Sequence, residues 1–305
     1  MPGSGLDGAC RRMLKAGEIR SLVVLCLAPP VCGCPHAPPI ARAPAALSLA
    51  DREALRAIAL TEFDGAVFYK PHPVAEADAL SELAPLIVQQ VLQDHSSSVR
   101  PVRTLTGVNL EATTGGAALS VPVADGLEVH GGASYVRIRG KRFAQVVYLW
   151  NNRADPGKHG SHWQGIRGTL GEDGFPLAWE VLGLQDAIRR FFVSDTLENA
   201  AAAKFGDALP GRSFAVERPA EEAPNALVVR TVEDGPIPLG PYVYIGADTN
   251  EVTTLLCRCS PAQVNRFVNT LYYRISPLED VEPSAAAMVE TKNDLDRCLR
   301  WPYGN

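Results

Sequence analysis

The chain has 305 residues, of which 46% are hydrophobic and 21% charged, and its formal net charge is -5 at pH 7. This composition is that of a globular protein, and it excludes a wholly disordered chain, a collagen and a polytopic membrane protein. The acidic balance also argues against a nucleic-acid-binding protein, because neutralising phosphates requires clustered Lys and Arg. The length is sufficient for a sizeable core, but the composition identifies no reaction.

The chain opens with a basic segment followed by an apolar one. The basic residues are Arg11, Arg12, Lys15 and Arg20. The apolar run that follows, residues 21–28, is too short to span a bilayer, which needs about 20 residues as a helix. A positive region followed by a short apolar region is typical of a secretory signal. We therefore expect residues 1–33 to be an export signal, with Met1 or Met13 as the true start. The alternative is a disordered cytoplasmic leader.

A cysteine follows this segment in a recognisable context. Val31-Cys32-Gly33-Cys34 resembles the lipobox of bacterial lipoproteins, in which an aliphatic residue and two small residues precede the cysteine that takes lipid. This four-residue resemblance implies lipidation of Cys34 and an exported protein attached to a membrane of the bacterial cell envelope. Cleavage before Cys34 leaves a net charge of -7. Such a body does not favour adhesion to anionic lipids, so the membrane is expected as a partner only through several acyl chains.

The remainder of the chain is expected to fold after a short tether. Residues 34–47 are rich in Pro and Ala, which favours extended polyproline II and excludes a regular helix. We then expect a single α+β domain over residues 48–275. Residues 276–305 are polar and are predicted to form a loosely held C-terminal tail.

Periodicity predicts the elements of this domain. Helical spacing favours helices over 49–60, 78–94, 184–192, 197–205 and 261–274, the first beginning at the capping residue Ser48 and the last at Ser260. Alternation favours strands over 108–112, 127–130, 134–139, 142–150, 164–170, 176–182, 226–232, 241–245 and 252–259. Gly131–Gly132 and residues 171–174 are interpreted as hairpin turns. The strands cluster in two blocks, so we expect an α+β fold with a mainly antiparallel sheet and flanking helices.

The sequence contains none of the common nucleotide-binding, zinc-protease or serine-hydrolase motifs. Two short clusters nevertheless predict a candidate zinc site, formed by His159, His162, Cys257 and Cys259. The two cysteines share one face of a strand, and two imidazoles with two thiolates suit tetrahedral zinc. A helix start after Cys259 would also favour thiol chemistry. The alternative is that both cysteines fill the core. Beyond this zinc, no cofactor is predicted.

A second candidate is a carbohydrate or small-ligand site. It combines aromatic and hydrogen-bonding groups from a connecting segment and its partner strand. Its residues are Trp150, Asn152, Trp163, Trp179 and Glu180. Such groups commonly line ligand pockets. The alternative is a sheet edge whose tryptophans pack on the body.

The longest basic stretch comprises Arg137, Arg139, Lys141 and Arg142. Strand alternation places several of these charges on one side. They form either a solvated strand face or a phosphate or lipid site.

These patterns favour an exported, lipid-anchored envelope protein that acts in binding or scaffolding, with a protein or small-molecule partner that the sequence does not identify. The alternative hypothesis is a metal- or thiol-dependent enzyme that uses the His/Cys cluster.

Overall fold

The computed structural model describes residues 47–59, 66–73, 78–90, 102–103, 109–110, 128–153, 161–184, 188–246, 249–258, 270–290 and 294–304. The chain divides into two units, residues 1–43 and 44–305, and all the described residues belong to the second. The expected export signal, the lipidation site Cys34 and nearly all of the tether therefore lie outside the described ranges. In the part of the chain that is described, no helix is long and apolar enough to cross a bilayer.

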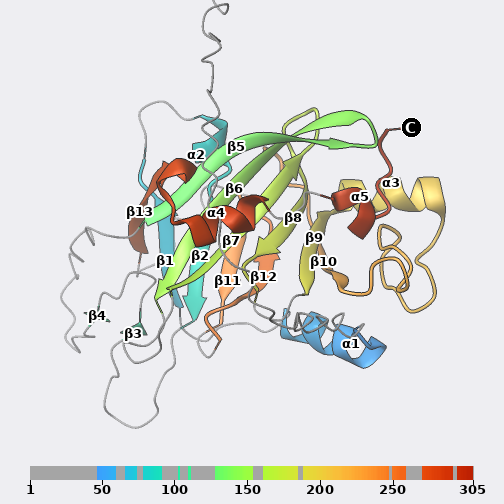
Figure 1. The fold of residues 1–305 in the computed structure, drawn as a ribbon, viewed down its shortest axis with the longest axis horizontal. Coiled ribbons are helices and arrows are strands. Elements are labelled where there is room, and N and C mark those ends of the chain that lie inside the picture. The colour runs from blue at the N-terminus through green and yellow to red at the C-terminus, as the bar shows by residue number, and fades with distance from the viewer. Residues whose placement is uncertain are drawn as a thin grey trace, which may run out of the picture. The chain divides into compact units, whose positions relative to one another are not determined.

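Strands dominate the second unit (Figure 1). Eleven of them form one sheet in the order β10-β9-β8-β7-β6-β5-β13-β1-β2-β11-β12. They are β1 (Ala66–Pro71), β2 (Leu86–Gln90), β5 (Glu128–Ile138), β6 (Lys141–Arg153), β7 (Ser161–Leu170), β8 (Pro176–Leu182), β9 (Arg189–Ser194), β10 (Ala226–Val232), β11 (Tyr242–Ile245), β12 (Val252–Leu256) and β13 (Thr270–Pro277). A separate pair consists of β3 (Val102–Arg103) and β4 (Asn109–Leu110). The helices are α1 (Leu49–Ile58), α2 (Ala79–Glu82), α3 (Asp195–Phe205), the 3-10 helix η2 (Leu278–Asp280), α4 (Pro283–Glu290) and α5 (Leu295–Cys298).

The expected α+β class with flanking helices is wrong, although antiparallel pairs do outnumber parallel ones in the sheet. Within the described part of the chain, 44% of the structure is strand and 22% is helix, and the helices are short. The sheet is mixed, because β1–β13, β2–β11, β5–β13 and β9–β10 are parallel pairs. Parallel neighbours require long crossover connections. The residue pattern of one strand does not indicate whether its neighbour in the sheet runs parallel or antiparallel to it.

Three segments that were predicted as helices contain strands instead. They are β2, β9 and the described part of 261–274, which belongs to β13. Buried strands have consecutive apolar residues, and such short runs do not distinguish helix from strand. Asp78 does cap a helix, but α2 ends after one turn, ahead of Pro85. The start expected at Ser260 lies outside the described residues.

Gly131 and Gly132 lie inside the continuous strand β5 rather than in a turn. A Cβ atom on Gly131 would lie 2.8 Å from Ile275 Cγ2, and one on Gly132 would lie 2.5 Å from Leu278 Cδ1. Both glycines therefore allow the segment from β13 to η2 to pack closely against β5. The chain turns instead at Arg139–Gly140, whose φ angles of 49° and 80° are those of a two-residue hairpin turn.

Several local predictions are confirmed. Helix α1 begins with a reciprocal capping box between Ser48 and Asp51. The hairpin across residues 171–174 joins β7 to β8 as predicted, and α3 ends at Gly206, whose φ is 79°. These features depend on contacts within a few residues, so the sequence encodes them locally.

All eleven strands contribute to one buried apolar cluster, from Leu227 of β10 to Leu255 of β12. The sheet therefore curves around its own core. Its outer side is covered in two places: by α4, which packs on Leu149, and by α3 with the C-terminal residues. The segment 276–305, expected as a loosely held tail, contains α4 and α5 and supplies Trp301, which is fully buried.

Strand β10 is an end strand of the sheet, and side chains satisfy its free backbone edge. Arg52 and Arg212 donate to the Ala226 carbonyl at 2.9 and 3.2 Å, and Arg56 Nε donates to the Val228 carbonyl at 3.0 Å. The edge is thus covered rather than left open to pairing with another chain. Because two of these arginines belong to α1, the same bonds attach that helix to the sheet.

The buried carboxylate of Glu217 balances these arginines. Both of its oxygens accept a hydrogen bond from Arg56 Nη2 at 3.0 Å. The carboxylate also lies 3.9 Å from the Arg52 guanidinium and 3.7 Å from that of Arg212. The Val228 amide also donates to it, at 3.3 Å. Burial lowers the pKa of Arg52 and Arg212, and Glu217 opposes that effect. Removing the carboxylate from a buried cluster of this kind destabilises the fold far more than breaking a surface ion pair does.

Replacing Glu217 with Gln should destabilise the fold by about 3–5 kcal/mol, because three guanidiniums lose their carboxylate in a buried site. Urea denaturation measures this loss. The matched control is Glu222→Gln, which removes an exposed partner of Arg218 and should cost less than about 1 kcal/mol. Equal losses in the two variants would contradict a central role for Glu217.

Candidate functional site

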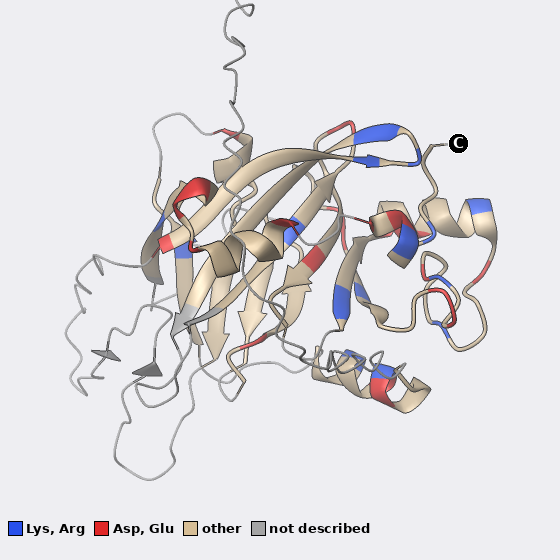
Figure 2. Ribbon diagram, in the orientation of Figure 1, with Lys and Arg blue, Asp and Glu red and all other residues tan. Residues whose placement is uncertain are grey.

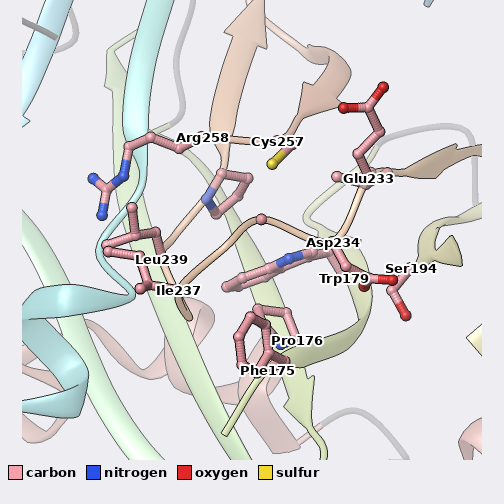
Figure 3. Close-up of a pocket in the computed structure, with 13 residues that line it drawn as sticks. Phe175, Pro176, Trp179, Ser194, Glu233, Asp234, Ile237, Leu239, Cys257 and Arg258 are labelled. Atoms are coloured by element: carbon pink, nitrogen blue, oxygen red, sulfur yellow. The ribbon is translucent and has the colours of Figure 1, made fainter. Parts of the chain in front are cut away.

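A pocket lies between the start of β8, the segment that follows β10 and the residues after β12 (Figure 3). It encloses about 410 Å³ of space, part of which is open to solvent. Its lining combines aromatic and aliphatic side chains with a thiol and a few charged groups. The lining residues are Phe175, Pro176, Trp179, Ser194, Val232, Glu233, Asp234, Gly235, Ile237, Leu239, Pro241, Cys257 and Arg258.

Trp179 provides the aromatic surface of the pocket. It is aligned with Gly168 of β7, and a Cβ atom on that glycine would lie 2.5 Å from the indole. The glycine therefore allows the indole to pack directly on the neighbouring strand. Trp179 is 4% exposed and also belongs to the central core, so the sheet holds it rigidly.

The segment between β10 and β11 forms a second wall. Near its start, Asp234 accepts hydrogen bonds from the Thr196 amide at 2.9 Å and the Thr196 hydroxyl at 2.8 Å, at the first turn of α3. Near its end, the Gly240 amide donates to the Glu82 carbonyl at 3.2 Å. A Cβ atom on Gly240 would lie 2.1 Å from the Leu83 carbonyl oxygen, so only glycine permits this approach. The segment is thus held near both ends.

Cys257 and Arg258 complete the site from the end of β12, but their side chains point differently. In Figure 3 the Cys257 sulfur is directed into the pocket, whereas the Arg258 guanidinium points away from it. Arg258 donates to the Glu82 carbonyl at 2.7 Å. Burial lowers its pKa, and nearby tyrosine hydroxyls oppose this effect. Arg258 therefore supports the wall of the pocket, and of the two side chains Cys257 is the one that faces a bound molecule.

The geometry suits binding of an apolar group. The indole of Trp179, the exposed side chain of Ile237 and the neighbouring Leu239 offer apolar surface on different walls. Polar groups that could orient a ligand are the Cys257 thiol and the rim acids Glu233 and Asp234. A predominantly apolar wall with a few polar groups is the usual composition of a small-molecule pocket.

The four residues predicted as zinc ligands are described only in part. The pocket contains Cys257, whereas His159 and Cys259, as well as the side chain of His162, lie outside the description. Within the described ranges, no group of three His, Cys, Asp or Glu side chains is placed to hold a metal ion. The backbone of His162 lies six residues, or about 20 Å, along β7 from Gly168, which pairs with Trp179. This separation weighs against His162 and Cys257 sharing one ion, and the zinc site stays a prediction.

The five residues predicted to bind a ligand do not converge. Trp150 and Trp179 lie in the central core, whereas Trp163 faces outward and donates to Glu282 at 3.4 Å. Only the backbone of Asn152 is described. Of this group, Trp179 alone lines the pocket.

Glu180, the fifth of these residues, is occupied by arginines. Its oxygens accept from Arg167 Nη1 at 3.3 Å and from Arg189 Nε at 2.8 Å. Arg189 extends this cluster to Asp294 at 2.5 Å and to the Cys298 sulfur at 2.8 Å. The Glu180 carboxylate therefore attaches the C-terminal segment to the sheet instead of facing a ligand.

Most residues that line the pocket were not predicted from the sequence. The overlooked lining residues are Phe175, Pro176, Ser194, Val232, Glu233, Asp234, Gly235, Ile237, Leu239, Pro241 and Arg258. One signal was present: Ile237 and Leu239 are apolar residues inside a loop rich in Gly and Pro, and Ile237 is 46% exposed. Large apolar side chains in a turn-forming segment indicate either packing or a binding surface.

No protein-family model matches this chain, no curated protein matches it, and no solved structure matches its fold.

The two described cysteines should differ sharply in reactivity. Cys257 is half-buried in the open pocket, whereas Cys298 is buried and its pKa is raised to about 11, chiefly by burial and against the opposing effect of Arg189. Since the thiolate is the reactive form, iodoacetamide at pH 8 should label Cys257 in the native protein and leave Cys298 unmodified.

Peptide mass spectrometry follows each site, with labelling in denaturant as the control in which both react. Equal native rates at Cys257 and Cys298 would show that the pocket does not expose its thiol.

Proposed function

We propose that this chain is a non-enzymatic binding protein of the bacterial cell envelope, exported by residues 1–33 and anchored through lipid on Cys34. The observation that carries the binding role is the pocket in which Trp179 and Cys257, far apart in sequence, line one apolar space. The export and anchoring roles are supported by the basic and apolar leader and by the lipobox-like residues 31–34.

The ligand that fits best is a small molecule with a flat apolar group. Such a group would lie against the Trp179 indole and contact Ile237 at the rim. Aromatic faces add stacking energy to the burial of apolar area. Glu233 and Asp234, both exposed at the pocket, favour a neutral or cationic ligand over an anionic one.

The second hypothesis remains a thiol- or metal-dependent enzyme. One observation favours its thiol form: the Cys257 side chain is directed into the pocket (Figure 3). We prefer the binding role because the apolar walls of the pocket are sufficient to bind a ligand. Thiol catalysis would also require a second catalytic group.

Loss of the exposed apolar side chain at the pocket should weaken binding of Nile red, a neutral apolar dye. Ile237→Ser removes part of one apolar wall, and we expect the dissociation constant measured by fluorescence titration to rise roughly fivefold. The matched control is Ile58→Ser on α1, a similarly exposed isoleucine that does not line the pocket; it should leave binding within twofold. Equal effects of the two substitutions would reject the pocket as the binding site.

Cell fractionation tests the anchor. The chain should enter the membrane fraction with a mass increase on Cys34, and Cys34→Ala should remove both the lipid and the membrane association. A Cys32→Ala variant is the control, because Cys32 is not the expected acylation site. If the full-length protein stays cytoplasmic and unacylated in all three forms, the envelope proposal fails.

A further inference from the structure

The tip of the β5–β6 hairpin carries a concentration of positive charge on an acidic protein. We call residues 132–144 the basic arm. Strand β5 pairs with β13 only as far as Gly131, and β6 pairs with β7 only from Gln145 onward. The arm therefore projects past both neighbouring strands, as Figure 1 shows for the long hairpin of β5 and β6. One face of the arm packs on the C-terminal residues through buried apolar side chains such as Phe143, so the opposite face is the one open to a surface.

One face of the arm consists of exposed cationic and aromatic groups. Arg137 and Arg142 are exposed and lie directly opposite each other in the strand register. The Arg142 guanidinium lies 3.5 Å from the ring centroid of Tyr135, which is 63% exposed. Like charges directly opposite each other destabilise a strand pair, so this arrangement is costly to the fold itself.

The arginines of the arm are not neutralised by the surrounding structure. Among the described residues, Arg137, Arg139 and Arg142 form no ion pair, whereas Lys141 pairs with Glu172 at 2.9 Å. The turn residue Arg139 lies 5.9 Å from the Phe205 ring. Three guanidiniums within six residues thus lack an acidic partner, on a chain whose net charge is -5.

Further cations gather beside the tip of the arm. The Phe205 ring at the end of α3 also has Arg300 at 4.7 Å and Lys204 at 5.8 Å. Figure 2 shows this positive charge on the hairpin tip and on the end of α3. The acids of the adjoining turns are Glu172, Asp173 and Asp207. Glu172 pairs with Lys141, and Asp173 accepts from the Phe175 amide of its own turn.

We propose that the basic arm binds the anionic headgroups of a lipid bilayer. Guanidiniums match phosphate oxygens through paired hydrogen bonds. An exposed tyrosine beside them suits the interface between headgroups and acyl chains, where aromatic and arginine side chains with apolar stems and polar ends concentrate. The arm adds an orienting contact to the proposed lipid anchor. This lipid contact uses only residues of the basic arm, so it can be tested independently of the export proposal.

Cosedimentation with vesicles of 30% phosphatidylglycerol and 70% phosphatidylcholine tests this inference. The probe is the full chain carrying Cys34→Ala, so that no acyl chain contributes to binding. Adding Arg137→Gln and Arg142→Gln together should lower the partition coefficient roughly 30-fold, since each basic residue near an anionic surface contributes about 1 kcal/mol. Hydrogen exchange of residues 132–144 should slow when these vesicles are added.

The matched control is Arg274→Gln, which removes an exposed arginine aligned with Glu128 at the opposite end of β5. It should change partitioning by less than twofold. Equal binding of the arm variant and the control would overturn the proposal, as would unchanged exchange of the arm. Preferential binding to transfer RNA, or complete competition by 10 mM inorganic phosphate, would also overturn it by identifying a different anion. These outcomes do not depend on where the protein resides in a cell.

Discussion

The arrangement around Glu217 is the interaction on which the end of the sheet depends. Its buried carboxylate compensates Arg52, Arg56 and Arg212, and these arginines in turn satisfy the free carbonyls of β10. Without that anion, three positive charges would be buried against one backbone edge, which is a strongly unfavourable arrangement. Because β10 leads directly into the segment that forms one wall of the pocket, order at this edge carries over to the candidate site.

The pocket is a consequence of the sheet curving around one core. β8 is near one end of the strand order and β12 is at the other, yet Trp179 and Cys257 line the same space. Trp179 belongs to the core and to the pocket wall at once, so its ring is already ordered before a ligand arrives. Such preorganisation reduces the entropic cost of binding.

The proposed envelope location links the tether to these features. Described structure begins at Leu47, whose amide donates to the Pro224 carbonyl at 3.4 Å, and α1 follows at once. A membrane anchor ahead of residue 47 would therefore be joined to the body beside the arginines that hold α1 to β10. The basic arm would then supply a second contact with lipid, at a different element from the anchor. Two separate contacts would define an orientation, which a single anchor alone does not provide.

Features that depend on neighbouring residues could be predicted from the amino-acid sequence. The helix start at Ser48, the 171–174 hairpin and the end of α3 after residue 205 were all predicted, because each rests on bonds within a few positions. The alternation in β5 and β6 also indicated a basic strand face. The lipobox-like residues 31–34 remain a local prediction of the same kind.

The sheet order, the mixed strand directions and the pocket could not be predicted in this way, because they arise from contacts between distant parts of the folded chain. The apolar run of β2 fits a helix or a buried strand equally well, and its placement between β1 and β11 resolves the choice. Glu180 and Trp179 are adjacent in sequence but face opposite sides of the sheet, so one joins an arginine cluster and the other lines the pocket. These outcomes depend on contacts between distant segments, and a pattern along one segment carries no information about which partner it will meet.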